Sequence, residues 1–206
     1  MRGMRVALIG ASGKIGSKIA AELLARGHQV TGVARHPEKM AVAGVTAVAG
    51  DFTRPHELAS ALRGHEAVLS AASFIPNQAE QLIAAVRASG VKRFLMVGGA
   101  ASLQAEPGGR KVIENLQLPE AWRAPVLEGI RTLDLLREVQ DLDWTFFSPA
   151  LRIGPGERTG KFRLGTEVVV KDEAGASWIS YDDYAIAMVD ELEQGRYLRA
   201  RFTIGY

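Results

Sequence analysis

The sequence contains no cysteine among its 206 residues. This absence excludes disulfides, a thiol nucleophile and any thiolate metal site, and it is typical of a chain in a reducing compartment. We therefore expect a cytoplasmic protein. The histidines lie on turns or helix starts, without the i, i+4 pairing or acidic neighbours of a metal site, so we expect solvated side chains and no metal. These are His28, His36, His56 and His65.

A strong charge imbalance is also missing, since 25 Lys and Arg face 23 Asp and Glu, scattered along the chain. Nucleic-acid binding calls for basic residues gathered into a stripe, so we expect no nucleic-acid partner. No apolar stretch approaches the roughly 20 residues that span a bilayer. The start, Met1-Arg2-Gly3-Met4, leads directly into an apolar run without a signal segment. We expect no membrane partner.

The composition is that of an ordinary globular protein, with 47% hydrophobic and 23% charged residues. A chain of 206 residues is long enough for one well-buried domain and short for two. We therefore expect a single domain over residues 1–206, in which residues 151–206 form a small C-terminal elaboration. The oligomeric state is left open by the sequence.

Three glycines recur at intervals of three residues directly after the apolar run Val6-Ala7-Leu8-Ile9. The segment reads Gly10-Ala11-Ser12-Gly13-Lys14-Ile15-Gly16. The first glycine permits a tight turn off a strand, the second lets a pyrophosphate approach the backbone, and the third lets a helix lie close to the sheet. The alternative is a merely flexible turn. We favour a dinucleotide cradle, in which the N-terminus of the helix faces the phosphates.

The following residues complete a strand, helix and strand unit. The expected helix stops at Gly27, and a second strand over residues 29–34 begins at once. This unit fits the roughly 30 residues of a dinucleotide-binding βαβ motif. Apolar and charged side chains fall on opposite faces of the helix: Ile15, Ile19, Leu23 and Leu24 against Lys18, Glu22 and Arg26.

Strand and helix patterns alternate through the rest of the first three quarters of the chain. They predict an α/β fold, a Rossmann-like doubly wound parallel sheet. Residues 105–123, rich in glycine and proline, are expected to form a long loop over the carboxyl edge of this sheet. Further strands are expected at residues 45–49, 67–72, 93–97 and 144–147, and helices at 55–63, 79–89 and 125–139.

The pattern changes after the sixth strand. Residues 167–171 and 176–180 resemble two strands joined by a turn. The sequence Ser180-Tyr181-Asp182-Asp183 resembles a capping box for a helix that runs to about residue 193. Carboxylates beyond its first turn are expected to face water. Residues 201–206 are expected to finish the sheet as an edge strand.

Two residues bear on the choice of dinucleotide. Arg35 stands where an NAD-preferring site would carry an acidic residue, and a guanidinium there would attract the 2′-phosphate of NADP. The alternative for Arg35 is an exposed residue at a strand end. Asp51 follows the third strand and either accepts a hydrogen bond from adenine or caps the turn before Pro55. We predict NADPH as the cofactor, with NAD also possible.

The chain resembles an atypical short-chain dehydrogenase/reductase of the NAD(P)H-binding group, which includes NmrA-like proteins, NADH-flavin reductases and flavin reductases of the biliverdin-reductase-B type. The matching motifs are the glycine segment, Val33-Ala34-Arg35-His36-Pro37, Gly50-Asp51, Val97-Gly98-Gly99-Ala100-Ala101-Ser102-Leu103, Trp144-Thr145-Phe146-Phe147-Ser148-Pro149 and Ile179-Ser180-Tyr181-Asp182-Asp183-Tyr184-Ala185.

This resemblance implies a role for particular residues. Arg35 takes the 2′-phosphate, Asp51 and Phe52 flank adenine, and Ala71 and Ala72 line the ribose. Ser102 lies in the motif that places a serine near hydride transfer in the flavin-reductase relatives, where it either orients the acceptor or caps a loop. The pyrophosphate is held by Gly10, Ser12, Gly13, Lys14 and Ile15, and the nicotinamide lies beside Gly98 and Pro149.

One departure from the superfamily limits the chemistry. The Tyr-x-x-x-Lys acid/base pair is missing, because none of Tyr181, Tyr184, Tyr197 and Tyr206 has a lysine four residues later. A flavin or quinone acceptor needs no such pair, since it takes hydride at a ring atom and draws its proton from water. We therefore expect an NAD(P)H-dependent reductase of a planar redox acceptor. The alternative is a non-catalytic, NAD(P)-sensing regulator of the NmrA type.

Aromatic residues could add a stacking wall for a flat substrate, although core positions are the more common role of such residues. The candidates are Phe74, Trp122, Trp144 and Trp178.

Overall fold

In the computed structural model, which describes residues 3–206, the apolar runs of the sequence become strands of one eight-stranded sheet. Met1 and Arg2, from the expected lead into the first strand, lie outside the described residues. The strand order is β3-β2-β1-β4-β5-β6-β10-β8, and all pairs are parallel except β10 with β8. The strands are β1 (Arg5–Ile9), β2 (Gln29–Ala34), β3 (Thr46–Ala49), β4 (Ala67–Ser70), β5 (Arg93–Val97), β6 (Asp143–Ser148), β8 (Arg163–Gly165) and β10 (Ala200–Gly205).

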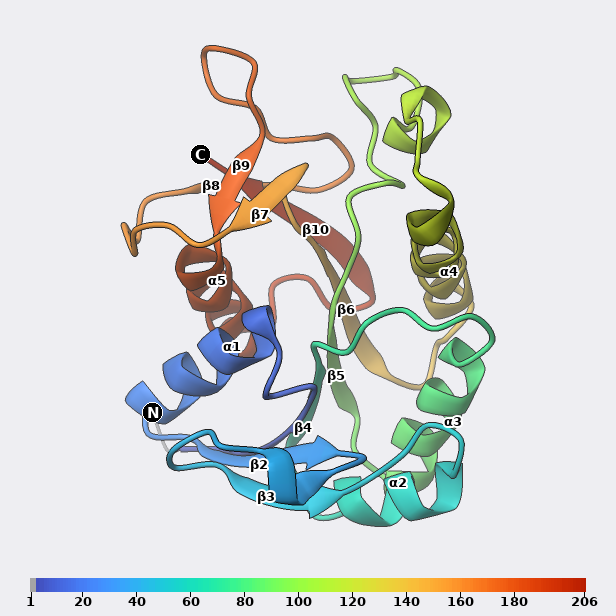
Figure 1. Cartoon of the computed structure of the whole chain (residues 1–206), viewed down its shortest axis with the longest axis vertical. Coiled ribbons are helices and arrows are strands. Elements are labelled where there is room, and N and C mark those ends of the chain that lie inside the picture. Colours follow the sequence, from blue (N-terminus) through green and yellow to red (C-terminus); the bar gives the residue numbers. More distant parts are fainter. Residues whose placement is uncertain (1–2) are drawn as a thin grey trace.

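Helices cover both faces of this sheet (Figure 1). Two of them, α1 and α5, lie on one face, and α2, α3 and α4 lie on the other. This arrangement is a Rossmann-like, doubly wound α/β fold, as the alternating pattern predicts. The helices are α1 (Lys14–Ala25), α2 (Pro55–Leu62), α3 (Ala79–Ser89), α4 (Glu120–Arg137) and α5 (Tyr181–Gln194), with short 3₁₀ turns η1 (Pro37–Lys39) and η2 (Val112–Asn115).

Two hydrophobic cores fill the spaces between the sheet and its helices. Every residue of β4 is buried, as expected for a central parallel strand with helices on both faces. On the α1 and α5 side, the Phe147 ring stacks between Tyr184 and Phe202, with centroid distances of 4.1 and 3.9 Å. These stacked rings join β6, α5 and β10, so the C-terminal segment is an integral part of the main core.

The C-terminal strands differ from the prediction. No named strand covers residues 167–171, where Val169 packs with Leu103 and Val112 and its N–H donates to the Gln104 carbonyl. Only the last part of 176–180 is a strand, β9 (Trp178–Ser180), and it pairs in parallel with β7 (Arg152–Gly154) in a separate two-stranded sheet. The strand expected over residues 201–206 forms as β10. The prediction that it lies at the edge of the sheet is wrong, since β6 and β8 flank it on both sides.

Helix α4 begins five residues before the predicted start at Pro125, so the last part of the expected loop 105–123 is helical. Pro119 stands immediately before the helix, with a φ of −54° that suits helix entry. Pro125 lies inside the helix, where it removes the hydrogen bond to the carbonyl of Ala121. Ala121 is exposed, so water can satisfy that carbonyl.

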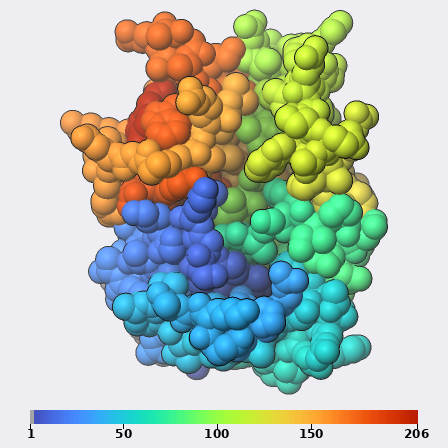
Figure 2. All heavy atoms as spheres, viewed as in Figure 1, coloured from blue at the N-terminus to red at the C-terminus, as the bar shows by residue number. Residues whose placement is uncertain are grey.

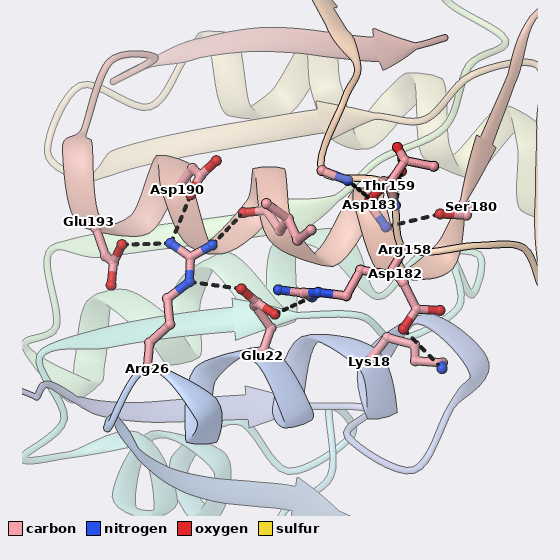
Figure 3. Close-up of polar contacts among 12 residues, drawn as sticks. Lys18, Glu22, Arg26, Arg158, Thr159, Ser180, Asp182, Asp183, Asp190 and Glu193 are labelled. Carbon is pink, nitrogen blue, oxygen red and sulfur yellow. Dashed lines mark hydrogen bonds and ion pairs between the residues drawn. The ribbon is translucent and has the colours of Figure 1, made fainter.

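The polar face of α1 is covered by α5 instead of by solvent (Figure 3). Glu22 is 4% exposed, and its carboxylate accepts hydrogen bonds from Arg26 and Arg158 at 2.8 and 2.5 Å. Burial raises the pKa of Glu22, but these two guanidinium groups outweigh it and hold the pKa below its usual value. The α1–α5 contact is therefore a charged seam that amphipathic periodicity alone does not predict.

Two expectations of solvated side chains are wrong at this side of the sheet. His28 is buried, and its Nε2 lies 3.1 Å from Glu193 of α5. Glu191 is fully buried, and its carboxylate receives a hydrogen bond of 2.8 Å from Arg93 on β5. Both groups are enclosed because α5 packs against the sheet and α1, so its later carboxylates meet cations and not water.

The helix α5 starts at the predicted cap, where Ser180 Oγ accepts a hydrogen bond from the Asp183 N–H at 3.0 Å. The buried Asp183 carboxylate in turn accepts hydrogen bonds from Thr159, Gly160 and the Tyr206 hydroxyl. Burial raises the pKa of Asp183, but these donors outweigh it and hold the pKa below its usual value. One carboxylate thus holds a loop, a helix and the end of β10 together.

We expect Asp183→Asn to destabilise the protein by roughly 2 kcal/mol near neutral pH, because it replaces an ionised acceptor of several hydrogen bonds. A lowered folded-state pKa gives stability above the unfolded value of about 3.9, which is lost as pH falls through the folded pKa. Urea unfolding should therefore show a penalty that shrinks below about pH 4. The half-exposed neighbour Asp182, paired with Lys18, is the control, and Asp182→Asn should cost less than about 1 kcal/mol. A penalty for Asp183→Asn that is independent of pH would contradict this account.

Candidate functional site

The glycine segment forms a bare backbone turn between β1 and α1. Gly10 has a φ of +81°, and a β carbon there would lie 2.9 Å from the backbone of Ala71. A β carbon at Gly16 would lie 2.0 Å from the Gly10 carbonyl oxygen. Both glycines are therefore required by the close approach of α1 to the strand ends, as the motif predicts.

The N-terminus of α1 is open to an anion. Gly13 precedes the helix without a side-chain cap, and the first turn contains no acidic residue. The first N–H groups of a helix lack intrahelical partners and carry the positive end of its dipole. Ser12, Gly13 and Lys14 are exposed and Ile15 is half-buried, so the backbone here is accessible.

A cavity of about 220 Å³ lies beside this turn, at the carboxyl ends of β1, β2 and β3. Gly10, Arg35, Asp51, Phe52 and Ala72 all line it, so the structure gathers five of the predicted cofactor residues around one space. This is the place where doubly wound sheets bind their ligands.

Arg35 and Asp51 give this cavity its charge. The exposed Arg35 guanidinium makes no hydrogen bond or ion pair with other side chains in the described range 3–206, so it is free to meet a ligand. The Asp51 carboxylate accepts a hydrogen bond of 2.8 Å from the Thr53 N–H. That bond, followed by the charges of Arg35 and Arg54, lowers the pKa of Asp51. The turn-capping role of Asp51 is therefore present, and it leaves the second carboxylate oxygen for a ligand.

The remaining cofactor candidates lie around the join between sheet and loops. Ala71 follows β4 directly, and its backbone lies close against Gly10. Gly98 follows β5, and its N–H donates a hydrogen bond to the Phe147 carbonyl. A β carbon at Gly98 would lie 2.3 Å from the Phe146 ring. Pro149 is buried after β6 and lines neither of the two larger cavities at this edge.

A second cavity, of about 370 Å³, contains both Gly98 and Ser102 in its wall. Ser102 is 7% exposed, and its Oγ accepts a hydrogen bond of 3.2 Å from Arg201 on β10. Arg201 is itself buried and bonds to the Glu167 carboxylate. Since a hydroxyl that accepts from Arg201 keeps its own hydrogen, Ser102 can donate into the cavity.

The two cavities adjoin at Ser73, which lines both. Figure 2 shows this face of the molecule, with a hollow between the yellow-green segment around α4 and the orange segment after β6. The charged cavity and the cavity at Ser102 lie next to each other along the carboxyl edge of the sheet, and we refer to the two together as the cleft. Such a cleft can hold an extended ligand and a second molecule at its end.

Of the aromatic residues that the sequence offers for a stacking wall, Phe74 and Trp122 line the cavity at Ser102. Trp122 is 64% exposed on the first turn of α4, so the alternative core role is wrong for it. Sequence reasoning missed the aliphatic part of the wall, such as Leu151, which lies far from Trp122 in the sequence. Arg201 gave no signal beyond a single charge in an apolar strand. Trp144, in contrast, is buried as a core residue.

These residues fit a nicotinamide dinucleotide. The exposed N-terminus of α1 offers N–H groups without a competing carboxylate, and the free guanidinium of Arg35 lies at the adjoining cavity. Any residue larger than glycine at position 10 or 16 would clash with nearby backbone atoms and disrupt the turn that lets a ligand approach. A dinucleotide held here would run from Arg35, past Gly10, toward Gly98.

None of the described helices has the length and apolar character needed to cross a membrane. Across residues 3–206, no group of three His, Asp or Glu side chains gathers in a way that could hold a metal ion.

The chain is similar to known proteins over nearly its whole length. A family model described as NAD(P)H-binding matches residues 10–194. The uncharacterised protein YwnB of Bacillus subtilis (strain 168) is 34% identical over 98% of both chains. A proposed epimerase from Bacteroides thetaiotaomicron has 40% identity and a TM-score of 0.92, covering 100% of this chain and 98% of that one. A proposed NADH-flavin reductase from Streptococcus pneumoniae TIGR4 has 32% identity and a TM-score of 0.86, covering 98% and 99%.

Proposed function

Because the chain belongs to the NAD(P)H-binding family, an atypical group of short-chain dehydrogenase/reductase proteins, we propose that it transfers hydride from NADPH to a flavin or quinone-like acceptor. An NAD(P)-dependent, oxidoreductase-like role follows from the family and from its relatives. The observation that carries the finer proposal is the cleft itself. A charged cavity beside the glycine turn adjoins a second cavity that contains Ser102.

Different residues of the cleft bind the cofactor and the acceptor in this reaction. The α1 N-terminus and Arg35 bind the phosphates of the cofactor, which when bound supplies a hydride. The cavity at Ser102 receives the acceptor next to Gly98. In the overall balance, NADPH, a proton and a quinone or flavin give NADP⁺ and the two-electron-reduced acceptor. The proton comes from water, and Ser102 donates a hydrogen bond to the acceptor.

Epimerase or alcohol chemistry is less well supported by the tyrosines. Tyr184 is fully buried, its hydroxyl donates to the Phe147 carbonyl at 2.6 Å, and burial raises its pKa well above the usual value. Tyr206 donates to Asp183, and burial raises its pKa as well. These two phenols are therefore held as neutral structural donors, and the residue four positions after Tyr184 is Met188 and not a lysine.

The proposal is tested by following NADPH consumption with a panel of flavins and quinones. We expect steady oxidation that requires both NADPH and an added acceptor. Saturable NADPH binding without turnover on any acceptor would instead support the non-catalytic sensor. Since both functions predict the same cofactor cavity, turnover is the property that separates them.

Ser102→Ala is expected to lower kcat by about 10- to 100-fold while leaving KM for NADPH nearly unchanged, because it removes a donor to the acceptor. Ser102→Thr, which keeps a hydroxyl, should retain most of the activity. Thermal unfolding of both variants checks that Arg201, still paired with Glu167, holds the local structure. Normal turnover by Ser102→Ala would remove Ser102 from the mechanism.

A further inference from the structure

The wall of the cavity at Ser102 is mostly apolar and carries no charge. Among the described residues, no ionisable side chain lines it. Its polar side-chain groups are the hydroxyls of Ser73 and Ser102 and the indole N–H of Trp122. The apolar part of the wall consists mainly of Phe74, Leu116, Trp122, Val126, Ile130 and Leu151.

The adjoining cofactor cavity differs in charge, since Arg35 and Asp51 line it together with the polar Gln78. The cation nearest to Ser102 is Arg201, which is buried outside the cavity wall and neutralised by Glu167. Nothing in the wall therefore offers a positive charge to an anionic ligand. A phosphate taken into the cavity would lose water and gain no charge-assisted hydrogen bond, which is costly.

The volume and the aromatic lining of the cavity suit a small planar molecule. Its volume of about 370 Å³ falls in the range of small-ligand sites, roughly 300–1,000 Å³. The aromatic side chains of Phe74, from a loop, and Trp122, from the first turn of α4, line the cavity, and such rings favour stacking on a planar π system. The hydroxyl hydrogen of Ser102 is the donor for one carbonyl oxygen.

From these observations we infer that the physiological acceptor is an uncharged, planar compound of the quinone class, and that the phosphate of a phosphorylated flavin contributes nothing to its recognition. This inference rests on the proposed reductase function and narrows its substrate. The quinone gains a hydride from NADPH and a proton from water, so its two carbonyl groups become the hydroxyls of a hydroquinone. Ser102, whose Oγ is held by Arg201, donates a hydrogen bond to one of these oxygens.

Binding is tested directly with menadione and the intrinsic fluorescence of the full chain. Menadione should quench Trp122 in a saturable manner. Trp122→Phe should remove the saturable part, because the remaining Trp144 and Trp178 do not line this cavity. Gly99→Val should also abolish it, since a β carbon at Gly99 meets no atom closer than Phe74 at 4.0 Å and the added methyl groups extend into free space. Thermal unfolding and NADPH titration should show that Gly99→Val is folded and still binds the cofactor.

The phosphate is tested by comparing riboflavin with FMN, which differ by that group alone. We expect KM for FMN to equal or exceed KM for riboflavin. We also expect kcat/KM for menadione to exceed kcat/KM for either flavin. An FMN KM that is tenfold or more below that of riboflavin would overturn the inference, as would a lack of saturable quenching by menadione. Failure of NADPH to bind the wild-type chain would instead overturn the proposed function, so the two failures are distinguishable.

Discussion

Arg35→Ala is expected to lower kcat/KM for NADPH by about 100-fold, because charge-assisted hydrogen bonds to a phosphate contribute on the order of 2–3 kcal/mol. Arg35 is exposed at the cofactor cavity, and its guanidinium has no partner among side chains of residues 3–206. NADH lacks the 2′-phosphate, so its kcat/KM should change by less than about threefold. Initial rates with both nucleotides and one acceptor give the ratio.

Arg35→Lys is the matched control, since it keeps the charge and loses the planar fork of donors. Its preference for NADPH should lie between those of the wild type and Arg35→Ala. If Arg35→Ala keeps the wild-type ratio of NADPH to NADH, the 2′-phosphate is bound elsewhere. Arg35 would then be the exposed strand-end residue of the alternative interpretation.

Ser12→Asp is expected to weaken NADPH binding by on the order of 100-fold, because a carboxylate would stand beside the pyrophosphate and repel it. Ser12 is exposed in the glycine turn, one residue before Gly13. A negative charge near a helix N-terminus stabilises the helix by roughly 0.3–1 kcal/mol, so the fold should be as stable as that of the wild type or slightly more stable. Calorimetric titration measures the first effect, and thermal unfolding measures the second.

Ser12→Asn has nearly the same shape without the charge, and it should bind NADPH within about threefold of the wild type. The difference between the Asp and Asn variants isolates electrostatic repulsion from any steric change. Equal affinities for these two variants would mean that no phosphate lies near the α1 N-terminus.

The geometry of the glycine turn could be predicted from the sequence because that turn is local. Gly10, Gly13 and Gly16 lie within one turn and the start of one helix, and their spacing is set by the backbone geometry of that turn. Arg35 follows because the second strand runs parallel to the first, so their carboxyl ends meet. Periodicity and turn residues report such short-range geometry directly.

The assembly of the cavity at Ser102 was not predictable in the same way. Phe74 and Leu151 come from separate loops, Trp122 comes from the first turn of α4, and Arg201 contacts Ser102 across 99 residues. The pairing of Glu22 with Arg158 spans 136 residues. Helical or strand periodicity states which face of an element is apolar, but it does not state which distant element covers that face. The charged seam between α1 and α5 and the cavity wall both depend on such partners.

The most direct test of this account is a calorimetric titration of the wild-type chain with NADPH. We expect heat that saturates at one NADPH per chain, with clearly weaker binding of NADH. An absence of heat and of saturation with either nucleotide at millimolar concentration would contradict the cofactor site, and with it the proposed reductase function.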